Sequence, residues 1–241
     1  MLPLADIHIH ILPGVDDGAP DWSVSERMVS MAYADGIRMM ILTPHHRGNM
    51  FQKSPEELNQ VFAEFSNRFS ERYKDMSCFL GCESYYEIDL SVKLSNGTVL
   101  PMAQSQYVLL EFSPNVEYSK IFKAVNTMIQ YNYFPILAHI ERYRCLRGKL
   151  DRIKELQSQG AYFQLNADSV IGKNGFLVQR FCTEVIRQGI ADFIASDAHR
   201  ADRRRPLLYE CSCYVAKRFG AECERMLFWK NAQAIAENKR I

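Results

Sequence analysis

The sequence lacks the features that mark secreted, membrane-spanning and low-complexity proteins. No apolar run approaches the roughly 18 residues that a membrane span needs, and the N-terminus has no basic segment followed by an apolar one. No stretch is rich in Gly, Ser or Pro, and no repeat of about 20 to 50 residues recurs. We therefore expect a cytoplasmic protein without membrane insertion, folded as a single domain over residues 1–241.

Paired cysteines and an excess of charge are absent as well. The seven cysteines are an odd number at irregular spacings without a CxxC pair, which indicates reduced thiols and not a disulfide framework. The formal net charge of +1 gives no overall attraction to a phosphate backbone, so we expect no nucleic-acid partner. The 47% hydrophobic fraction is ample for one large core.

Histidine is scarce, and its six copies are not scattered. Five of them follow short apolar runs that are typical of buried strands. These five are His8, His10, His45, His139 and His199. Because alternate residues of a strand share a face, His8 and His10 point the same way, either as metal ligands or as two hydrogen-bonded or surface histidines. The sixth, His46, is interpreted as a solvated loop residue or as one that supports a ligand.

Strand-like and helix-like segments alternate along the chain. The strand-like runs cover residues 4–10, 39–42, 78–82, 107–110, 134–138, 162–165 and 192–195. Between them lie helical patterns, with capping boxes at Ser23 and Glu26 and at Ser54 and Glu57, and with Asn231 as the cap of the last helix. Residues 47–53 are predicted to be a loop over the strand ends. Seven such units predict an α/β fold with parallel strands, a distorted (β/α)7 TIM-like barrel.

Polar residues end every predicted strand, where a barrel active site is built. The candidate metal ligands are His8, His10, Asp17, His45, Glu83, Glu111, His139, Asp197 and His199. Five imidazoles and four carboxylates are too many for one tetrahedral ion, so they indicate two or three cations with bridging carboxylates. Ligands of this kind suit manganese, iron or zinc, and the share of carboxylates favours Mn2+. The alternative is that some of them form buried hydrogen-bonded pairs.

The motifs around these residues are specific. They comprise residues 6–10, 12–18, 43–45, 139–143 and 196–199, the less general stretches 47–51 and 84–86, and Glu83 and Glu111. Together they resemble the polymerase-and-histidinol-phosphatase (PHP) superfamily over nearly the whole chain. Within it, they are most similar to the metal-dependent protein-tyrosine phosphatases of bacterial capsule and exopolysaccharide loci. The resemblance implies a PHP fold with the metal site at the C-terminal ends of the strands.

That resemblance also implies a three-metal site. The first metal would be held by His8, His10, Glu83 and Asp197. The second would share Glu83 and be held by Glu111 and His139. The third would be held by Asp17, His45 and His199. Arg142 and Arg204 match the positions at which the family binds phosphate, although a slip of one residue within the run 203–205 remains open.

The resulting hypothesis is a phosphatase that hydrolyses phosphotyrosine in proteins. Hydroxide activated by the metals would attack phosphorus, while Arg142 and Arg204 neutralise the phosphoryl oxygens. None of the seven cysteines has Arg six residues later, which argues against a thiol nucleophile. The implied partner is an autophosphorylating bacterial tyrosine kinase that controls capsule or exopolysaccharide synthesis. The sequence does not indicate an oligomeric state.

Further substrate contacts and other functions stay open at this point. Tyr85 and Tyr86 either flank a substrate ring or simply pack, and Arg200, Arg203 and Arg205 either contact substrate or form a solvated rim that attracts acidic peptide. The alternative functions are a small-molecule phosphatase of the histidinol-phosphate type, a non-catalytic PHP binding module, and a nuclease.

Overall fold

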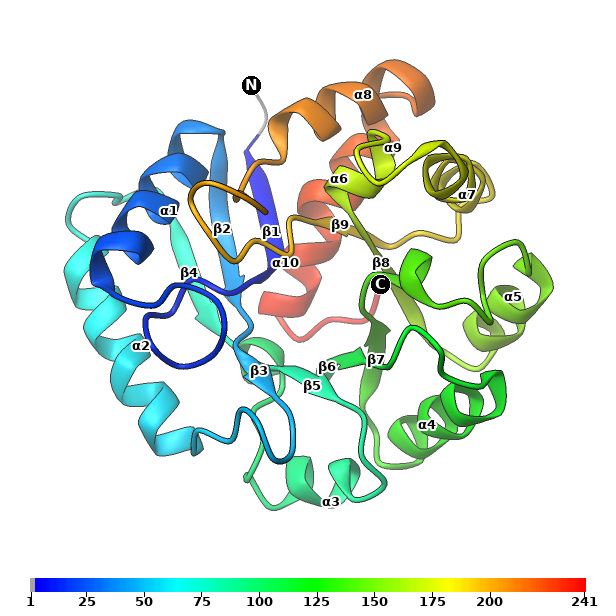
Figure 1. Ribbon diagram of the computed structural model, residues 1–241, viewed down its shortest axis with the longest axis horizontal. Coiled ribbons are helices and arrows are strands. Elements are labelled where there is room, and N and C mark those ends of the chain that lie inside the picture. Colours follow the sequence, from blue (N-terminus) through cyan, green and yellow to red (C-terminus); the bar gives the residue numbers. More distant parts are fainter. Residues whose placement is uncertain (1–2) are drawn as a thin grey trace.

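A curled sheet of parallel strands forms the centre of the computed structural model, which describes residues 3–241 (Figure 1). The strands are β1 (Leu4–Ile9), β2 (Ile37–Leu42), β3 (His45–His46), β4 (Ser77–Leu80), β5 (Glu83–Tyr85), β6 (Tyr107–Glu111), β7 (Phe134–Leu137), β8 (Tyr162–Asn166) and β9 (Phe193–Ala195). They pair in the orders β1-β2-β4 and β3-β5-β6-β7-β8-β9, and every pair is parallel. The predicted α/β fold with a parallel sheet is confirmed.

Two neighbouring strands of the sheet are each broken into two segments. Pro44, which has no backbone N–H, separates β2 from β3, and Gly81 lies between β4 and β5. A Cβ at Gly81 would lie 2.8 Å from the Cα atom of Met102, so only glycine fits there. The chain continues in the same direction across both breaks, since Gly81 N–H donates to Leu42 O and Glu83 N–H to Pro44 O. With each broken pair counted once, the described strands occupy the seven positions that the sequence predicts.

The first and last strands meet at their C-terminal ends. Asp197 N–H donates to His8 O, and His10 N–H donates to Ala198 O, both at 2.9 Å. Ile9 and Ala198 form an isolated parallel bridge beside these bonds. The residues that follow β9 are therefore held against the two histidines of β1.

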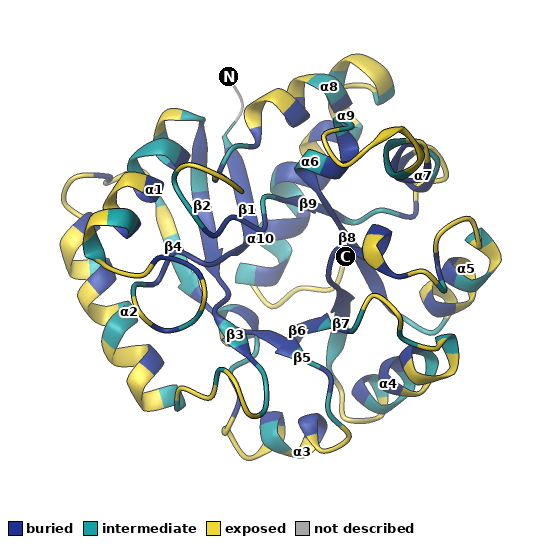
Figure 2. Cartoon of the chain, viewed as in Figure 1, coloured by how far each residue is buried: buried dark blue, intermediate teal, exposed yellow. Residues whose placement is uncertain are grey.

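Helices surround the sheet, with their inner faces buried and their outer faces exposed (Figures 1 and 2). They are α1 (Trp22–Ala34), α2 (Pro55–Phe69), α3 (Leu90–Ser95), α4 (Tyr118–Gln130), α5 (Leu150–Ser158), α6 (Ala167–Val170), α7 (Phe176–Arg187), α8 (Tyr209–Phe219), α9 (Ala221–Arg225) and α10 (Asn231–Ala236). Single turns form η1 (Met102–Gln104), η2 (Ile140–Arg142) and η3 (Met226–Lys230), the last with π-helical bonding. Among the described residues, no helix is long and apolar enough to cross a membrane.

The helix starts test the capping predictions. The box at Ser54 is confirmed, because Ser54 Oγ accepts from Glu57 N–H while the Glu57 side chain accepts from Ser54 N–H. The box at Ser23 is wrong: Asp21 caps α1 by accepting from Val24 N–H, since an aspartate two residues earlier starts the helix first.

The predicted cap at Asn231 is also wrong. The chain stays helical from η3 into α10, so Asn231 lies inside a helical segment. Its side-chain amide donates to Asp192 O at 2.8 Å and ties this segment to the residue before β9.

Alternate residues of the strands supply two apolar clusters. Val108 and Leu110 of β6 face the larger cluster between sheet and helices, while Tyr107 and Leu109 face a smaller cluster on the other side of the same strand. Ile235 of α10 packs in this smaller cluster. A sheet buried on both faces explains why its strands read as continuous apolar runs.

Candidate metal centre

A tight loop after β1 shapes one wall of the site. Gly14 N–H donates to Ala19 O and Ala19 N–H donates to His10 O, which folds the loop back on the strand end. A Cβ at Gly18 would lie 2.2 Å from His10 O, so this close approach requires glycine. Asp17 is thereby brought to 3.4 Å from His45 and 3.6 Å from His199, between its Oδ1 atom and the Nε2 atom of each ring.

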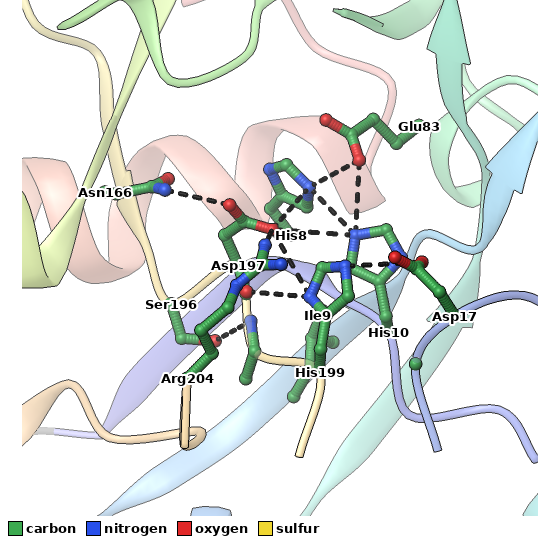
Figure 3. A network of polar contacts seen from close by, with 12 residues as sticks. His8, Ile9, His10, Asp17, Glu83, Asn166, Ser196, Asp197, His199 and Arg204 are labelled. Carbon is green, nitrogen blue, oxygen red and sulfur yellow. Dashed lines mark hydrogen bonds and ion pairs between the residues drawn. The ribbon is translucent and has the colours of Figure 1, made fainter. Parts of the chain in front are cut away.

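The most buried group of polar side chains comprises His8, His10, Glu83 and Asp197 (Figure 3). Their ligand-type atoms all lie within 4.8 Å of one another. Glu83 Oε2 is 3.1 Å from His8 Nε2 and 3.2 Å from His10 Nε2, and the two Nε2 atoms are 3.2 Å apart. The group comes from the end of β1, from Glu83 at the start of β5 and from the segment after β9, and it has the members that the resemblance implies for one metal.

Two further groups share members with the first. One comprises His10, Asp17, His45 and His199, and the other comprises His45, Glu83 and Glu111. His139 contacts the same carboxylates, with Nε2 at 2.9 Å from Glu83 Oε1 and 3.9 Å from Glu111 Oε1. The structure thus brings all nine predicted ligands together, although His45 and not His139 completes the group around Glu111, and His10 joins the third group.

Hydrogen bonds to the outer ring nitrogens fix how three imidazoles face the centre. His8 Nδ1 lies 3.1 Å from Gln164 Oε1, His10 Nδ1 is 2.7 Å from Asp16 Oδ2, and His199 Nδ1 is 3.0 Å from Asp197 O. When each Nδ1 donates to its oxygen, the lone pair of the neutral ring lies on Nε2. The Nε2 lone pairs of His8 and His10 then face each other and a carboxylate, an arrangement that needs a cation or protons between them.

Buried atoms without partners support a cation here. Glu83 Oε2, Glu111 Oε2 and His45 Nδ1 form no hydrogen bond of suitable geometry with the described residues, although imidazole nitrogens lie close to Glu83 Oε2. His45 Nδ1 lies 3.1 Å from Glu83 Oε2 and 4.0 Å from Glu111 Oε2. Because unpaired buried polar atoms are costly, this donor set fits metal ions that would satisfy all three.

The charges in the cluster shift its pKa values in opposite directions. Burial and the nearby Glu83 carboxylate raise the pKa of Glu111 to about 7. Burial and the Arg142 guanidinium lower the pKa of His139 to about 4, which keeps its imidazole neutral. Burial alone would lower the pKa of His10, but Asp16 outweighs it and raises the pKa to about 10. In the absence of cations, the cluster therefore holds protons on some ligands and not on others.

Two arginines close over Asp197 from different loops. Arg142, in η2, donates to Asp197 Oδ2 at 2.6 Å, and Arg204 donates to Oδ1 at 2.6 Å. Their side chains are still 39% and 43% exposed, so further N–H groups are accessible to a ligand. His139, Asp197 and Arg204 all have positive φ, a strained conformation that is concentrated at this site.

A cavity of about 340 Å³ opens over these groups. Its lining includes both arginines and six of the nine predicted ligands: Asp17, His45, Glu83, Glu111, Asp197 and His199. It also includes Arg47, Met50 and Phe51, which the sequence placed only in a loop. A signal was present, because residues 47–51 belong to the resemblance and hold two large apolar side chains in a loop.

The remaining predicted contacts lie outside this cavity lining. Tyr85 lies under the Arg47 guanidinium, Tyr86 is buried against Phe112, and both line a separate cavity of about 190 Å³. Arg200 is half-buried, whereas Arg203 and Arg205 are exposed; none of the three lines the 340 Å³ cavity. His46 is buried on β3 and belongs to none of the three ligand groups.

A buried amide relay that the sequence did not reveal supports the cluster. Gln164 Oε1 accepts from His139 N–H and faces His8 Nδ1, and Gln164 Nε2 donates to Asn166 Oδ1. Asn166 Nδ2 in turn donates to Asp197 Oδ2 (Figure 3). The available signal was Gln164, a polar residue between Phe163 and Leu165 of strand β8.

A curled parallel sheet with imidazoles and carboxylates gathered at its strand ends is the architecture of metal-dependent hydrolases. The chain belongs to the CpsB/CapC family of capsular polysaccharide synthesis, whose family model matches residues 4–237. The resemblance inferred from the motifs is thus confirmed.

Individual relatives cover the chain almost completely. It is 30% identical to the tyrosine-protein phosphatase CpsB of Streptococcus agalactiae over 246 positions, which span 99% of this chain and 100% of that protein. Among solved structures, it is similar to one reported for YwqE from Bacillus subtilis and CpsB from Streptococcus pneumoniae, described as metal-dependent tyrosine phosphatases. The TM-score is 0.91 at 28% identity, covering 99% of this chain and 96% of that one.

A more distant likeness extends to histidinol phosphate phosphatase from Lactococcus lactis, solved with zinc, L-histidinol and phosphate. Here the TM-score is 0.60 at 14% identity, covering 90% of this chain and 94% of that one. At this identity the likeness concerns the fold alone.

Proposed function

We propose that this chain is a metal-dependent protein-tyrosine phosphatase. The observation that carries the proposal is the buried cluster of imidazoles and carboxylates with two arginines at the mouth of the same cavity. The phosphatases that share the chain's whole length and fold support the same reaction. The substrate is phosphotyrosine in a protein, and the reaction is hydrolysis of its phosphate monoester.

The nine predicted ligands would hold the metals: eight of them form the three overlapping groups that the geometry defines, and His139 contacts Glu83 and Glu111 beside these groups. Bound divalent cations would lower the pKa of water and neutralise phosphoryl oxygens. We propose Mn2+, because carboxylates contribute almost half of the ligands, with iron or zinc as alternatives.

Arg142 and Arg204 would bind the phosphoryl group. Both guanidinium groups are positioned by Asp197 and remain partly exposed to the cavity. Paired N–H donors of this planar shape match phosphoryl oxygens and stabilise charge that develops during transfer. The phenolate of tyrosine, with a pKa of about 10, leaves without a strong general acid.

A thiol mechanism has no support in this site. Within residues 3–241, no cysteine lines the cavity, and burial raises the pKa of the Cys78 and Cys82 thiols to about 12. Thiols of that kind are poor nucleophiles at neutral pH.

The proposal extends to the partner, the location and the fold of the protein. Its partner would be an autophosphorylating bacterial tyrosine kinase of capsule or exopolysaccharide synthesis, and its location the cytoplasm. The fold would be one domain with a distorted (β/α)7 barrel, which the backbone bonds between β1 and the residues after β9 support. Tyr85 and Tyr86 stay predicted neighbours of the substrate ring, and Arg200, Arg203 and Arg205 stay predicted substrate contacts of the rim.

The test is a side-by-side assay of the manganese-loaded protein. A phosphotyrosine peptide, histidinol phosphate and single-stranded DNA are offered at equal concentration, and released phosphate or cleaved DNA is measured. We expect the highest kcat/KM on the phosphotyrosine peptide. Preferential hydrolysis of histidinol phosphate, or cleavage of DNA alone, would overturn the proposal.

A further inference from the structure

A small hairpin over the metal candidates is not explained by metal or phosphate binding. Arg47 N–H donates to Phe51 O at 2.9 Å, and Phe51 N–H donates to Arg47 O at 3.0 Å. The turn between them includes Asn49 at a φ of 66°. Residues 47–51 are thus an ordered element directly after His45 and His46 of β3, where the sequence predicted a loop.

Side-chain contacts fix the hairpin on both edges. The Arg47 guanidinium lies over the Tyr85 ring, 4.3 Å from its centroid, and Gly48 N–H donates to Glu87 Oε1. A Cβ at Gly48 would lie 2.2 Å from that same oxygen, so glycine allows the close approach. The Phe51 ring stacks on His45 with 5.5 Å between centroids and 16° between planes. The hairpin is therefore positioned before any substrate binds.

The cavity is lined mostly by ionisable residues, with two apolar residues on the hairpin. Nine of its eleven residues are ionisable: Asp17, His45, Arg47, Glu83, Glu111, Arg142, Asp197, His199 and Arg204. The other two are Met50 and Phe51, on the hairpin. Met50 is 62% exposed and Phe51 is half-buried, and both line the cavity. An apolar group that enters this cavity finds apolar partners on one side only.

We propose that the hairpin 47–51 binds the aryl group of the phosphoester and so selects aryl over alkyl phosphates. With the phosphoryl group at the arginines and the metal candidates, the ester group projects toward the mouth, where Met50 and Phe51 contact a ring. Thioether and aromatic side chains both pack favourably against an aromatic ring. The inference rests on the proposed function and adds which residues bind the leaving group.

The test compares two non-hydrolysable ligands of the manganese-loaded protein, so that binding is measured without turnover. Phenylphosphonate and methylphosphonate share the charged head and differ in the aryl group, and their Kd values are measured by calorimetry. We expect wild type to bind phenylphosphonate about 10-fold more tightly. Phe51→Ala and Met50→Ser should each remove most of that ratio while methylphosphonate binding changes less than 2-fold. Phe51→Tyr should keep it.

Two controls separate loss of the aryl contact from other causes of a changed Kd ratio. Phe176→Ala removes an aromatic ring that is 73% exposed outside this cavity, and it should leave both Kd values unchanged. Since Phe51 stacks on His45, metal content is measured in every variant; if Phe51→Ala loses metal, the Met50→Ser ratio decides.

Equal weakening of both phosphonates, or an unchanged ratio in metal-replete variants, overturns the aryl site. Failure of the proposed function has a different signature. Wild type would then hydrolyse no phosphotyrosine peptide, whatever the ratio of the two phosphonates.

Discussion

Among single residues, Asp197 contacts both predicted metal ligands and the predicted phosphate-binding arginines. Its carboxylate lies 3.5 Å from His8 and 3.7 Å from His10, and both predicted phosphate-binding arginines donate to it. Burial alone would raise the pKa of Asp197, but the charges of His8 and Arg142 outweigh it, so this pKa lies well below its usual value. Its removal would disturb both metal and phosphate binding, whereas loss of His8 would remove one imidazole.

We expect His8→Ala and Asp197→Ala each to lower kcat/KM on a phosphotyrosine peptide by at least about 10³-fold, since each deletes a predicted ligand. The fold should persist, because neither change removes an apolar side chain from the core. Bound manganese, measured by elemental analysis, should fall in both variants. Wild-type turnover in either one would show that the centre lies elsewhere.

Arg142→Ala and Arg204→Ala should each lower kcat/KM by roughly 10²- to 10³-fold, the scale for loss of one electrostatic donor in a protected site. Metal content should not change. Arg142→Lys should rescue poorly, because a point charge lacks the two-pronged geometry of a guanidinium.

Arg200→Ala is the matched control for the two arginines, since Arg200 lies outside the cavity lining. It should cost little with a small substrate and more with an acidic peptide at low salt. Near-normal kinetics in both cavity variants, with metal retained, would place the phosphate elsewhere.

At the scale of elements, the sequence indicated which segments form strands and where their polar ends lie. Apolar runs ending on His8, His45, Glu83 or His139 were enough to predict that these side chains gather in one place, because the C-terminal ends of parallel strands lie at one edge of the sheet. The breaks beside Pro44 and Gly81 were not predicted, since they depend on contacts with η1 and with the neighbouring strand. The hairpin 47–51 was missed for a similar reason: its bonds are local, but its anchors Tyr85 and Glu87 lie far along the chain.

One substitution in the loop after β1 and one at the start of α2 together test whether this loop positions the site. Gly18→Ala places a methyl group against His10 O, so the loop that carries Asp16 and Asp17 must move. We expect kcat/KM to fall at least about 10-fold, because small displacements of reacting groups are costly. Ser54→Ala removes only the cap of α2, so it should lower the free energy of unfolding by about 1 kcal/mol and leave kcat/KM unchanged. The opposite pattern would mean that the loop does not position the site.

For the whole molecule, metal should contribute to stability as well as to activity. Removal of divalent cations should abolish hydrolysis and lower Tm, because the clustered carboxylates lose their counter-charges. Manganese at about 100 times its Kd should add about 2.7 kcal/mol to the free energy of unfolding for each site that it fills. Alkylation of accessible thiols should change little. Full activity in excess chelator, once metal removal is verified, would contradict the mechanism.

A second whole-molecule property is the pH dependence of stability through Asp192, which precedes β9 and belongs to none of the three ligand groups. Burial raises its pKa to about 7, and its carboxylate accepts from Phe163 N–H. The unfolded chain ionises this group near its ordinary pKa of 3.8, so stability falls as the pH rises from about 4 to 7.

Asp192→Asn keeps an oxygen acceptor without the charge. It should raise the free energy of unfolding by about 2 kcal/mol at pH 8 and have little effect at pH 4, as measured by urea denaturation. Equal effects at both values would exclude the titration of Asp192 as the cause.

The meeting of β1 with the residues after β9 also has a consequence for biosynthesis. His8 and His10 leave the ribosome first, but Asp197, His199 and Arg204 follow only after most of the chain has been translated. No nascent fragment that ends before β9 contains the first ligand group, however well its earlier strands pair. The two groups that include Asp197 or His199 would therefore be completed late in translation, whereas His45, Glu83 and Glu111 are all present once residue 111 has been made.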